Sequence, residues 1–148
     1  SKGSGDMYSK GANLLHTIRQ ITNDDEKWRK TLRGLNKTFY HQTVTSNQIE
    51  NYISENIGFN LKYVFDQYLR NIRIPTLEYT IKDKKFKYRW SNTIDGFNMP
   101  IEVIIDKKKQ WLSPTNSWKE MSIRNKTIEV DRDYYVYTEE LSTKKLPK

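Results

Sequence analysis

The sequence predicts an α+β fold, in which a bundle of helices is followed by a small antiparallel β-sandwich of the immunoglobulin-like kind. Two periodicities carry this prediction. Apolar residues recur at three- and four-residue spacing from Tyr8 to about Ile74, and from Thr76 onward they recur at every second residue. Pro75 stands where the period changes. We therefore expect a helical unit over residues 1–75, a sandwich over 76–137 and a tail or linker over 138–148.

The first two helices are predicted by two apolar stripes with a polar break between them. The break is Asn23-Asp24-Asp25, in which Asp24 or Asp25 is expected to cap the second helix. We interpret both stripes as core rather than as a cofactor site. They consist of Tyr8, Ala12, Leu15 and Ile18, and of Trp28, Leu32, Leu35 and Phe39.

The third and fourth helices have clearer boundary signals. Thr45-Ser46-Asn47-Gln48 has the form of a capping box at a helix start, and Gly58 is a natural C-terminal stop. The fourth helix is expected to end before Pro75. The residues expected to point inward are Ile49, Tyr52 and Ile53 in the third helix, and Leu61, Val64, Phe65, Tyr68 and Leu69 in the fourth.

The second half predicts five to seven short strands joined by tight turns, with turns at Asp83-Lys84 and over 106–109. Aromatic residues on these strands could form a carbohydrate-binding platform, but their alternation with polar residues favours an inward-facing core. The apolar sets are Leu77, Tyr79 and Ile81; Phe86, Tyr88 and Trp90; Ile101, Val103 and Ile105; Trp111; Met121 and Ile123; Ile128 and Val130.

The charge of the chain does not favour a nucleic-acid partner. The formal net charge is +8 over 148 residues, but 1–75 and 76–148 each contribute +4, so neither half is a dedicated basic domain. The lysine clusters fall at predicted hairpin turns, where lysine commonly keeps a sheet edge soluble. No apolar run is long enough to span a membrane, and the lack of cysteine excludes a disulfide scaffold. Compartment and oligomeric state are left open.

Two motifs resemble the aminopeptidase N family of zinc metallopeptidases, the gluzincins. Tyr8-Ser9-Lys10-Gly11-Ala12 resembles the family's Tyr-x-Lys-Gly-Ala signature, and Phe65-Asp66-Gln67-Tyr68-Leu69 followed by Ile74-Pro75 resembles the passage that closes its catalytic domain. The resemblance covers about residues 6–136. It implies the end of a thermolysin-like catalytic domain followed by a β-sandwich module, in an enzyme that removes N-terminal residues from peptides.

By this resemblance, Tyr8 is the catalytic residue. Its phenol would donate a hydrogen bond to the tetrahedral intermediate of peptide hydrolysis, at the oxygen where negative charge develops. The alternative is that Tyr8 simply begins the apolar face of the first helix. We interpret Lys10 and Gly11 as structural, and Asp66 as part of a cap or a salt bridge.

The chain does not contain the family's zinc site. A His-Glu-x-x-His motif places two histidines one helical turn apart, whereas His16 and His41, the only histidines, are too distant in sequence and neither is followed by Glu. We interpret both as solvated. The chain is therefore expected to be a downstream fragment that is inactive alone and binds no zinc, while the full-length enzyme holds zinc on ligands outside this chain.

Two other classes of function remain open at the level of sequence. A non-catalytic relative could keep the scaffold as a protein-interaction module, and an independent helix-plus-sandwich module could bind acidic or saccharide ligands. The zinc motif of the parent sequence separates the enzyme from both.

Overall fold

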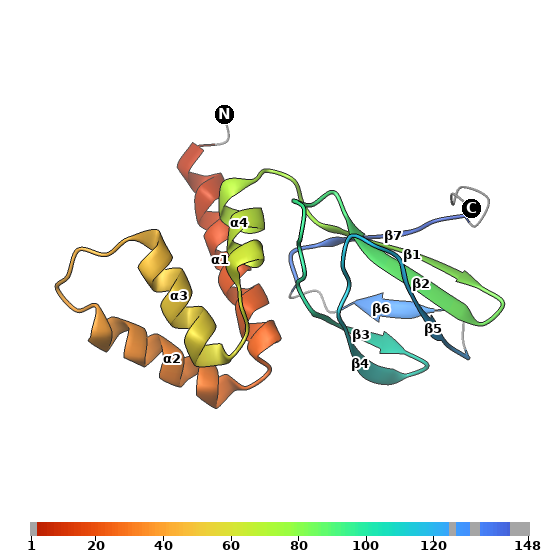
Figure 1. Ribbon diagram of the computed structural model, residues 1–148, viewed down its shortest axis with the longest axis horizontal. Coiled ribbons are helices and arrows are strands. Elements are labelled where there is room, and N and C mark those ends of the chain that lie inside the picture. Colours follow the sequence, from red (N-terminus) through yellow and green to blue (C-terminus); the bar gives the residue numbers. More distant parts are fainter. Residues whose placement is uncertain (1–2, 125–126, 131–133, 143–148) are drawn as a thin grey trace.

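The computed structural model describes residues 3–124, 127–130 and 134–142 (Figure 1). The α+β prediction is confirmed: the described chain forms four helices followed by seven strands. The helices are α1 (Gly3–Thr22), α2 (Asp25–Thr38), α3 (Ser46–Ile57) and α4 (Lys62–Arg70). The strands are β1 (Thr76–Lys82), β2 (Lys85–Ser91), β3 (Ile101–Ile105), β4 (Lys108–Leu112), β5 (Lys119–Ser122), β6 (Ile128–Val130) and β7 (Tyr137–Glu140).

Local capping sets the limits of α2 and α3, as the sequence predicts. Asp24 is the N-cap of α2, and its Oδ1 accepts a hydrogen bond from the amide of Lys27 at 3.0 Å. Thr45 and Gln48 form the capping box of α3. Gly58 ends α3 with φ 77°, a left-handed conformation that costs glycine little.

The inward face of α1 differs from the predicted stripe. Leu15 is 48% exposed, whereas Leu14 is 4% exposed and Ile18 is fully buried. The buried stripe is Leu14, Thr17, Ile18 and Ile21, which places a threonine in the core. The apolar pattern does not distinguish the two stripes, because Thr17 is polar and Leu14 and Leu15 are both leucine. Leu69 of α4, also expected inward, is 47% exposed.

Two sheets share one apolar core in the second half. Their strand orders are β5-β2-β1-β7 and β4-β3-β6. Along β2 the alternation is as predicted, because Phe86, Tyr88 and Trp90 are buried while Lys85 and Lys87 are exposed. The β3–β4 turn is shorter than predicted: Asp106 and Lys107 form it, with φ 54° and 64°, and β4 begins at Lys108.

Strand β7 corrects two expectations. It pairs in parallel with β1, with Thr76 opposite Tyr137, so the sandwich is not wholly antiparallel. The pairing continues through the amide of Leu141, which donates to the carbonyl of Tyr79 at 2.8 Å, so residues 138–141 belong to the sheet rather than to a tail. The remainder of the expected tail, 143–148, lies outside the described residues.

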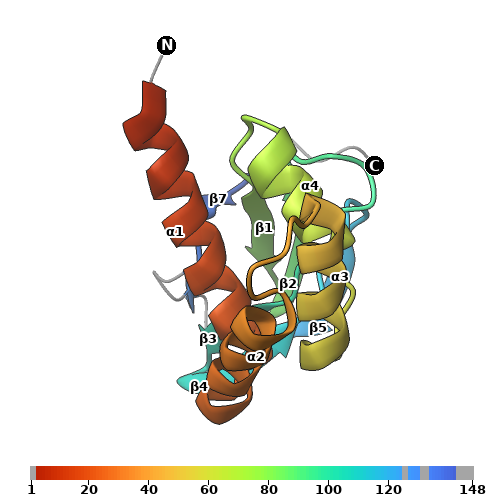
Figure 2. The same ribbon diagram turned by 90° about the vertical axis from the view of Figure 1, so that its left-hand side faces the viewer.

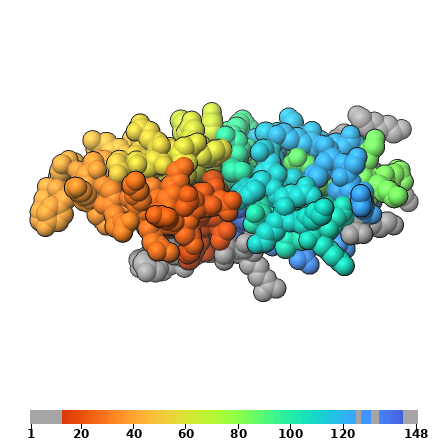
Figure 3. Space-filling model, turned by 90° about the horizontal axis from the view of Figure 1, so that it is seen from below, coloured from red at the N-terminus to blue at the C-terminus, as the bar shows by residue number. Residues whose placement is uncertain are grey.

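The helices and the sheets lie end to end along the long axis of the molecule (Figure 3). Side chains of α4 connect them. Gln67, fully buried, donates through Nε2 to the carbonyl of Arg73 at 2.8 Å and accepts at Oε1 from the amide of Ile94 at 2.7 Å. The hydroxyl of Tyr68 donates to the carbonyl of Tyr135 at 2.7 Å. We call these contacts of Gln67 and Tyr68 the junction.

Candidate functional site

The predicted catalytic residue, Tyr8, lies in the first half of α1. The side chains of α1 are described from Asn13 onward, so the contacts of Tyr8 lie outside the described part. Leu15 is seven positions after Tyr8 in the sequence, and Arg19 is eleven positions after it. These spacings are close to two and three helical turns, so the three positions share one face of α1. Leu15 is 48% exposed, and the side chain of Arg19 is 47% exposed. This face of α1 therefore turns away from the core of the chain.

The C-terminal half of α1 fixes the position of that face. Leu14 and Ile18 pack in the core, and the hydroxyl of Thr17 accepts a hydrogen bond from the amide of Tyr135 at 3.4 Å. The N-terminal turns of α1 stand clear of α4 at the top of the view in Figure 2. The packed C-terminal half of α1 thus fixes the direction in which these turns extend.

The second predicted motif, Phe65 to Leu69, has a structural role in α4. Phe65 and Tyr68 are 4% and 3% exposed, and burial raises the pKa of the Tyr68 phenol far above its ordinary value. Gln67 completes the junction. Asp66 accepts from Lys62 and Arg70, both at 2.9 Å, so its interpretation as a salt-bridge residue is confirmed.

Sequence reasoning missed an ion pair between α3 and α4. The guanidinium of Arg70 donates from Nη2 to Oε2 of Glu50 at 2.6 Å and from Nη1 to Oε1 at 3.2 Å. The hydrogen bonds to Glu50, together with its charge, raise the pKa of Arg70. A signal existed in the sequence, because Glu50 shares its helical face with Ile53 and Ile57, and a carboxylate on a buried face requires a partner.

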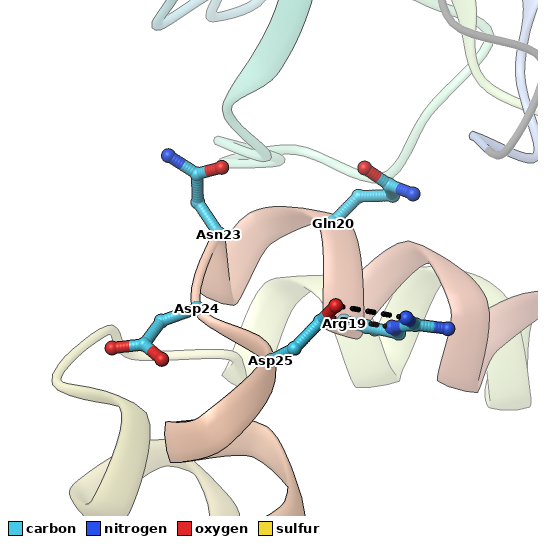
Figure 4. A pocket seen from close by; sticks show the side chains of 5 residues that line it. All are labelled: Arg19, Gln20, Asn23, Asp24 and Asp25. Carbon is cyan, nitrogen blue, oxygen red and sulfur yellow. Dashed lines mark hydrogen bonds and ion pairs between the residues drawn. The ribbon is translucent and has the colours of Figure 1, made fainter.

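The polar hollow in Figure 4 lies where α1 meets α2. It has a volume of 320 Å³ and is lined by Arg19, Gln20, Asn23, Asp24 and Asp25. Arg19 and Asp25 form a two-bond fork, at 2.9 Å from Nε to Oδ1 and 3.0 Å from Nη2 to Oδ2. Since Asp24 caps α2, the charged groups of this hollow already serve the helix–helix connection.

A second hollow lies at the far end of α2 and α3. Its volume is 510 Å³, and we call it the tip pocket. It is lined mostly by apolar and aromatic side chains: Leu35, Asn36, Phe39, Tyr40, His41 and Ile49.

The described residues contain no group of three or more His, Cys, Asp or Glu side chains that could hold a metal ion. His16 and His41 are both exposed, on α1 and after α2 respectively, and the structure does not bring them together. Tyr88 and Trp90 are core residues, at 8% and 1% exposed, as the alternation predicts, while Trp111 is 37% exposed on β4. Within the described part, no helix combines the length and the apolar character needed to cross a bilayer.

Comparison with known proteins gives a likeness to solved structures but none to a family model or a curated protein. No model of a known protein family matches the chain, and no curated protein matches it. Among solved structures, it is similar to aminopeptidase A of Legionella pneumophila, determined in complex with aspartic acid, with a TM-score of 0.64 and 17% identity. The likeness covers 91% of this chain and 18% of that one, so the chain spans less than a fifth of the length of that enzyme. At this identity the likeness shows the fold alone: the helices and the two sheets form an aminopeptidase-like fold.

Proposed function

We propose that this chain is the part of a zinc-dependent aminopeptidase that supplies the transition-state-stabilising tyrosine, Tyr8. The observation that carries the proposal is the fold likeness, which extends over 91% of the chain and falls on a segment of an aminopeptidase. The Tyr8-Ser9-Lys10-Gly11-Ala12 motif, on which the family resemblance rests, lies in α1. Peptides are the proposed substrates of the intact enzyme.

The exposed face of α1 suits this role. A residue that acts on a substrate held by other segments of the enzyme has to point away from its own core, and position 8 shares the exposed face of Leu15 and Arg19. Hydrolysis of a peptide bond places negative charge on the former carbonyl oxygen, and a phenol donor stabilises that charge more in the transition state than in the ground state. Tyr8 would therefore lower the barrier without adding much to substrate affinity.

The described residues bring together no set of side chains that would hold zinc. His16 and His41 lie on separate elements, and no cluster of metal-ligating side chains occurs among the described residues. We therefore assign the zinc ligands of the proposed enzyme to other segments of the parent protein, and we expect the chain alone to be inactive and free of tightly bound zinc.

The test is Tyr8→Phe in the intact parent protein, with Tyr137→Phe, an exposed tyrosine on β7, as the matched control. Tyr8→Phe is expected to lower kcat by about 10²–10³-fold, the usual loss for one such donor. The KM for aminoacyl-anilides, the zinc content and the Tyr137→Phe activity should stay near wild type.

Near-normal turnover of Tyr8→Phe would contradict the catalytic assignment. A parent that lacks a zinc motif and has no turnover would instead support the non-catalytic, interaction-module alternative. Stoichiometric zinc that stays with the isolated chain after dialysis against a weak chelator would contradict the assignment of the ligands to other segments.

A further inference from the structure

The end of the molecule formed by α2 and α3 combines an apolar pocket with a group of exposed cations. This end lies farthest from the sandwich, where the loop between the two helices turns back (Figure 1). It does not contain Tyr8 or the junction, so its role is separate from the function proposed above.

The tip pocket is open and apolar. Leu35, Phe39 and Ile49 are only partly buried, and Tyr40 is 71% exposed. The ring of Tyr40 meets that of His41 edge-on, with centroids 4.1 Å apart. A volume of 510 Å³ is within the usual range of about 300–1,000 Å³ for ligand pockets, and it accommodates a single large apolar side chain with its flanking backbone.

A row of three cations runs along α2 toward this pocket. Arg29, Arg33 and Lys37 follow one another at four-residue spacing, which stacks them on one face of the helix, and all three are exposed. Asn36, which lines the pocket, lies three residues after Arg33 and so borders the row. We call these three residues the basic row.

The stability of α2 does not account for the basic row. Like charges at four-residue spacing destabilise a helix by about 0.2–0.5 kcal/mol per pair. Arg29 acts on Asp25, whose pKa it helps to lower, but Arg33 and Lys37 make no ion pair within the described part of the chain. The surface therefore has positive charge available for an acidic partner.

The charges at the start of α2 limit what that partner can be. Asp24, Asp25 and Glu26 lie about one turn before the row and would repel a long polyanion that continues along the helix. Nucleic acid also needs an extended basic track for its phosphates, and the row offers three positions. A short acidic segment with an apolar anchor matches both the pocket and the length of the row.

We propose that the tip pocket and the basic row form a docking site for an acidic peptide segment of a partner protein. One large apolar side chain of the segment fills the pocket between Leu35, Phe39 and Ile49. Carboxylates on its flanking residues pair with Arg33 and Lys37.

The experiment measures fluorescence anisotropy of the full 148-residue chain with a labelled peptide of Glu and Ser residues around a central Phe. Saturable binding is expected, and it should weaken at higher salt, because the screening length falls from ~10 Å at 0.1 M to ~3 Å at 1 M. Arg33→Glu should weaken binding by about fivefold or more, since it replaces an attraction with a repulsion. Tyr40→Ala should weaken it by a similar factor, and both residues are exposed enough for the fold to survive.

Lys87→Glu is the control, because it makes the same change of net charge on β2, distant from the tip, at an exposed position. It should bind as wild type does. The proposal is overturned by the absence of saturable binding, by equal effects of Arg33→Glu and Lys87→Glu, or by equal binding of a peptide in which Ser replaces Phe. Duplex DNA or phosphatidylserine vesicles that bind as tightly as the peptide, and lose binding with Arg33→Glu, would also overturn it.

Discussion

The two halves of the molecule bury different kinds of side chain. In the second half, the largest fully buried side chains are the aromatic rings of Phe86, Trp90 and Phe97. In the helices, they are the smaller Ile18, Leu61 and Val64, together with the polar Gln67. The second half is thus rich in buried aromatic rings, while the helical half also has the buried amide of Gln67 at the junction and the partly exposed Glu50–Arg70 pair. Single substitutions should affect the two halves in different ways.

The largest effect on stability is expected for Trp90→Ala in the sandwich. Trp90 is 1% exposed, its indole donates to the carbonyl of Met99 at 2.9 Å, and its ring meets that of Phe97 edge-on at 5.3 Å. Truncation of a buried Trp costs about 3–5 kcal/mol of unfolding free energy. Urea unfolding measures the loss, with Trp111→Ala on the edge strand β4 as the control. Equal losses for the two variants would show that the buried aromatic cluster does not dominate the sandwich.

A smaller loss of unfolding free energy is expected for Gln67→Met at the junction. This change keeps the length of the side chain and leaves the amide of Ile94 and the carbonyl of Arg73 without the partners they have in the fold. One unsatisfied buried group costs about 1–3 kcal/mol. Gln42→Met is the control, because Gln42 is exposed and makes one long contact of 3.3 Å.

The same variant tests whether the junction couples the two halves. Far-ultraviolet circular dichroism reports mainly the helices, and tryptophan fluorescence reports mainly the second half, which holds Trp90, Trp111 and Trp118 while Trp28 lies in α2. If the junction couples the halves, the two wild-type unfolding transitions should coincide. In Gln67→Met the helical transition should move to lower urea more than the fluorescence transition. Coincident transitions in the variant would mean that the hydrogen bonds of Gln67 do not couple the two halves.

The smallest effect is expected at the exposed fork between Arg19 and Asp25. The hydrogen bond from Arg19 lowers the pKa of Asp25 below its ordinary value of 3.8. Since the folded-state pKa is the lower one, the stabilisation is present above pH 3.8 and is lost as the pH falls through the folded-state pKa. Arg19→Gln should raise the pKa of Asp25, measured by NMR titration, while stability at neutral pH barely changes. A large loss of stability at neutral pH would show that the Arg19–Asp25 fork contributes as much to stability as the hydrogen bonds at the junction.

Local chemistry made much of the fold predictable from sequence. The N-cap at Asp24, the capping box at Thr45 and the stop at Gly58 each depend on residues within one helical turn. The alternation of apolar and polar residues likewise predicts β2 and β3 from neighbouring residues alone, because successive residues of a strand face opposite sides of the sheet.

What escaped prediction depends on distant partners. All four residues of β7 are exposed and none shows an apolar alternation, so the strand is defined only by its pairing with β1. The Glu50–Arg70 pair joins residues twenty apart. The catalytic role of Tyr8 depends on groups outside this chain, and it stays a prediction.

The parallel pairing of β7 with β1 has a consequence for how the chain folds. Thr76 and Tyr137 are neighbours in the sheet although sixty-one residues separate them, and Thr17 meets the amide of Tyr135 across 118 residues. Contacts so far apart in sequence form late, because the loop must close before they contribute. During synthesis, the open edge of β1 therefore stays without its neighbour until β7 has emerged from the ribosome. Interrupted synthesis before that point would leave an unpaired strand edge, which is where aggregation begins.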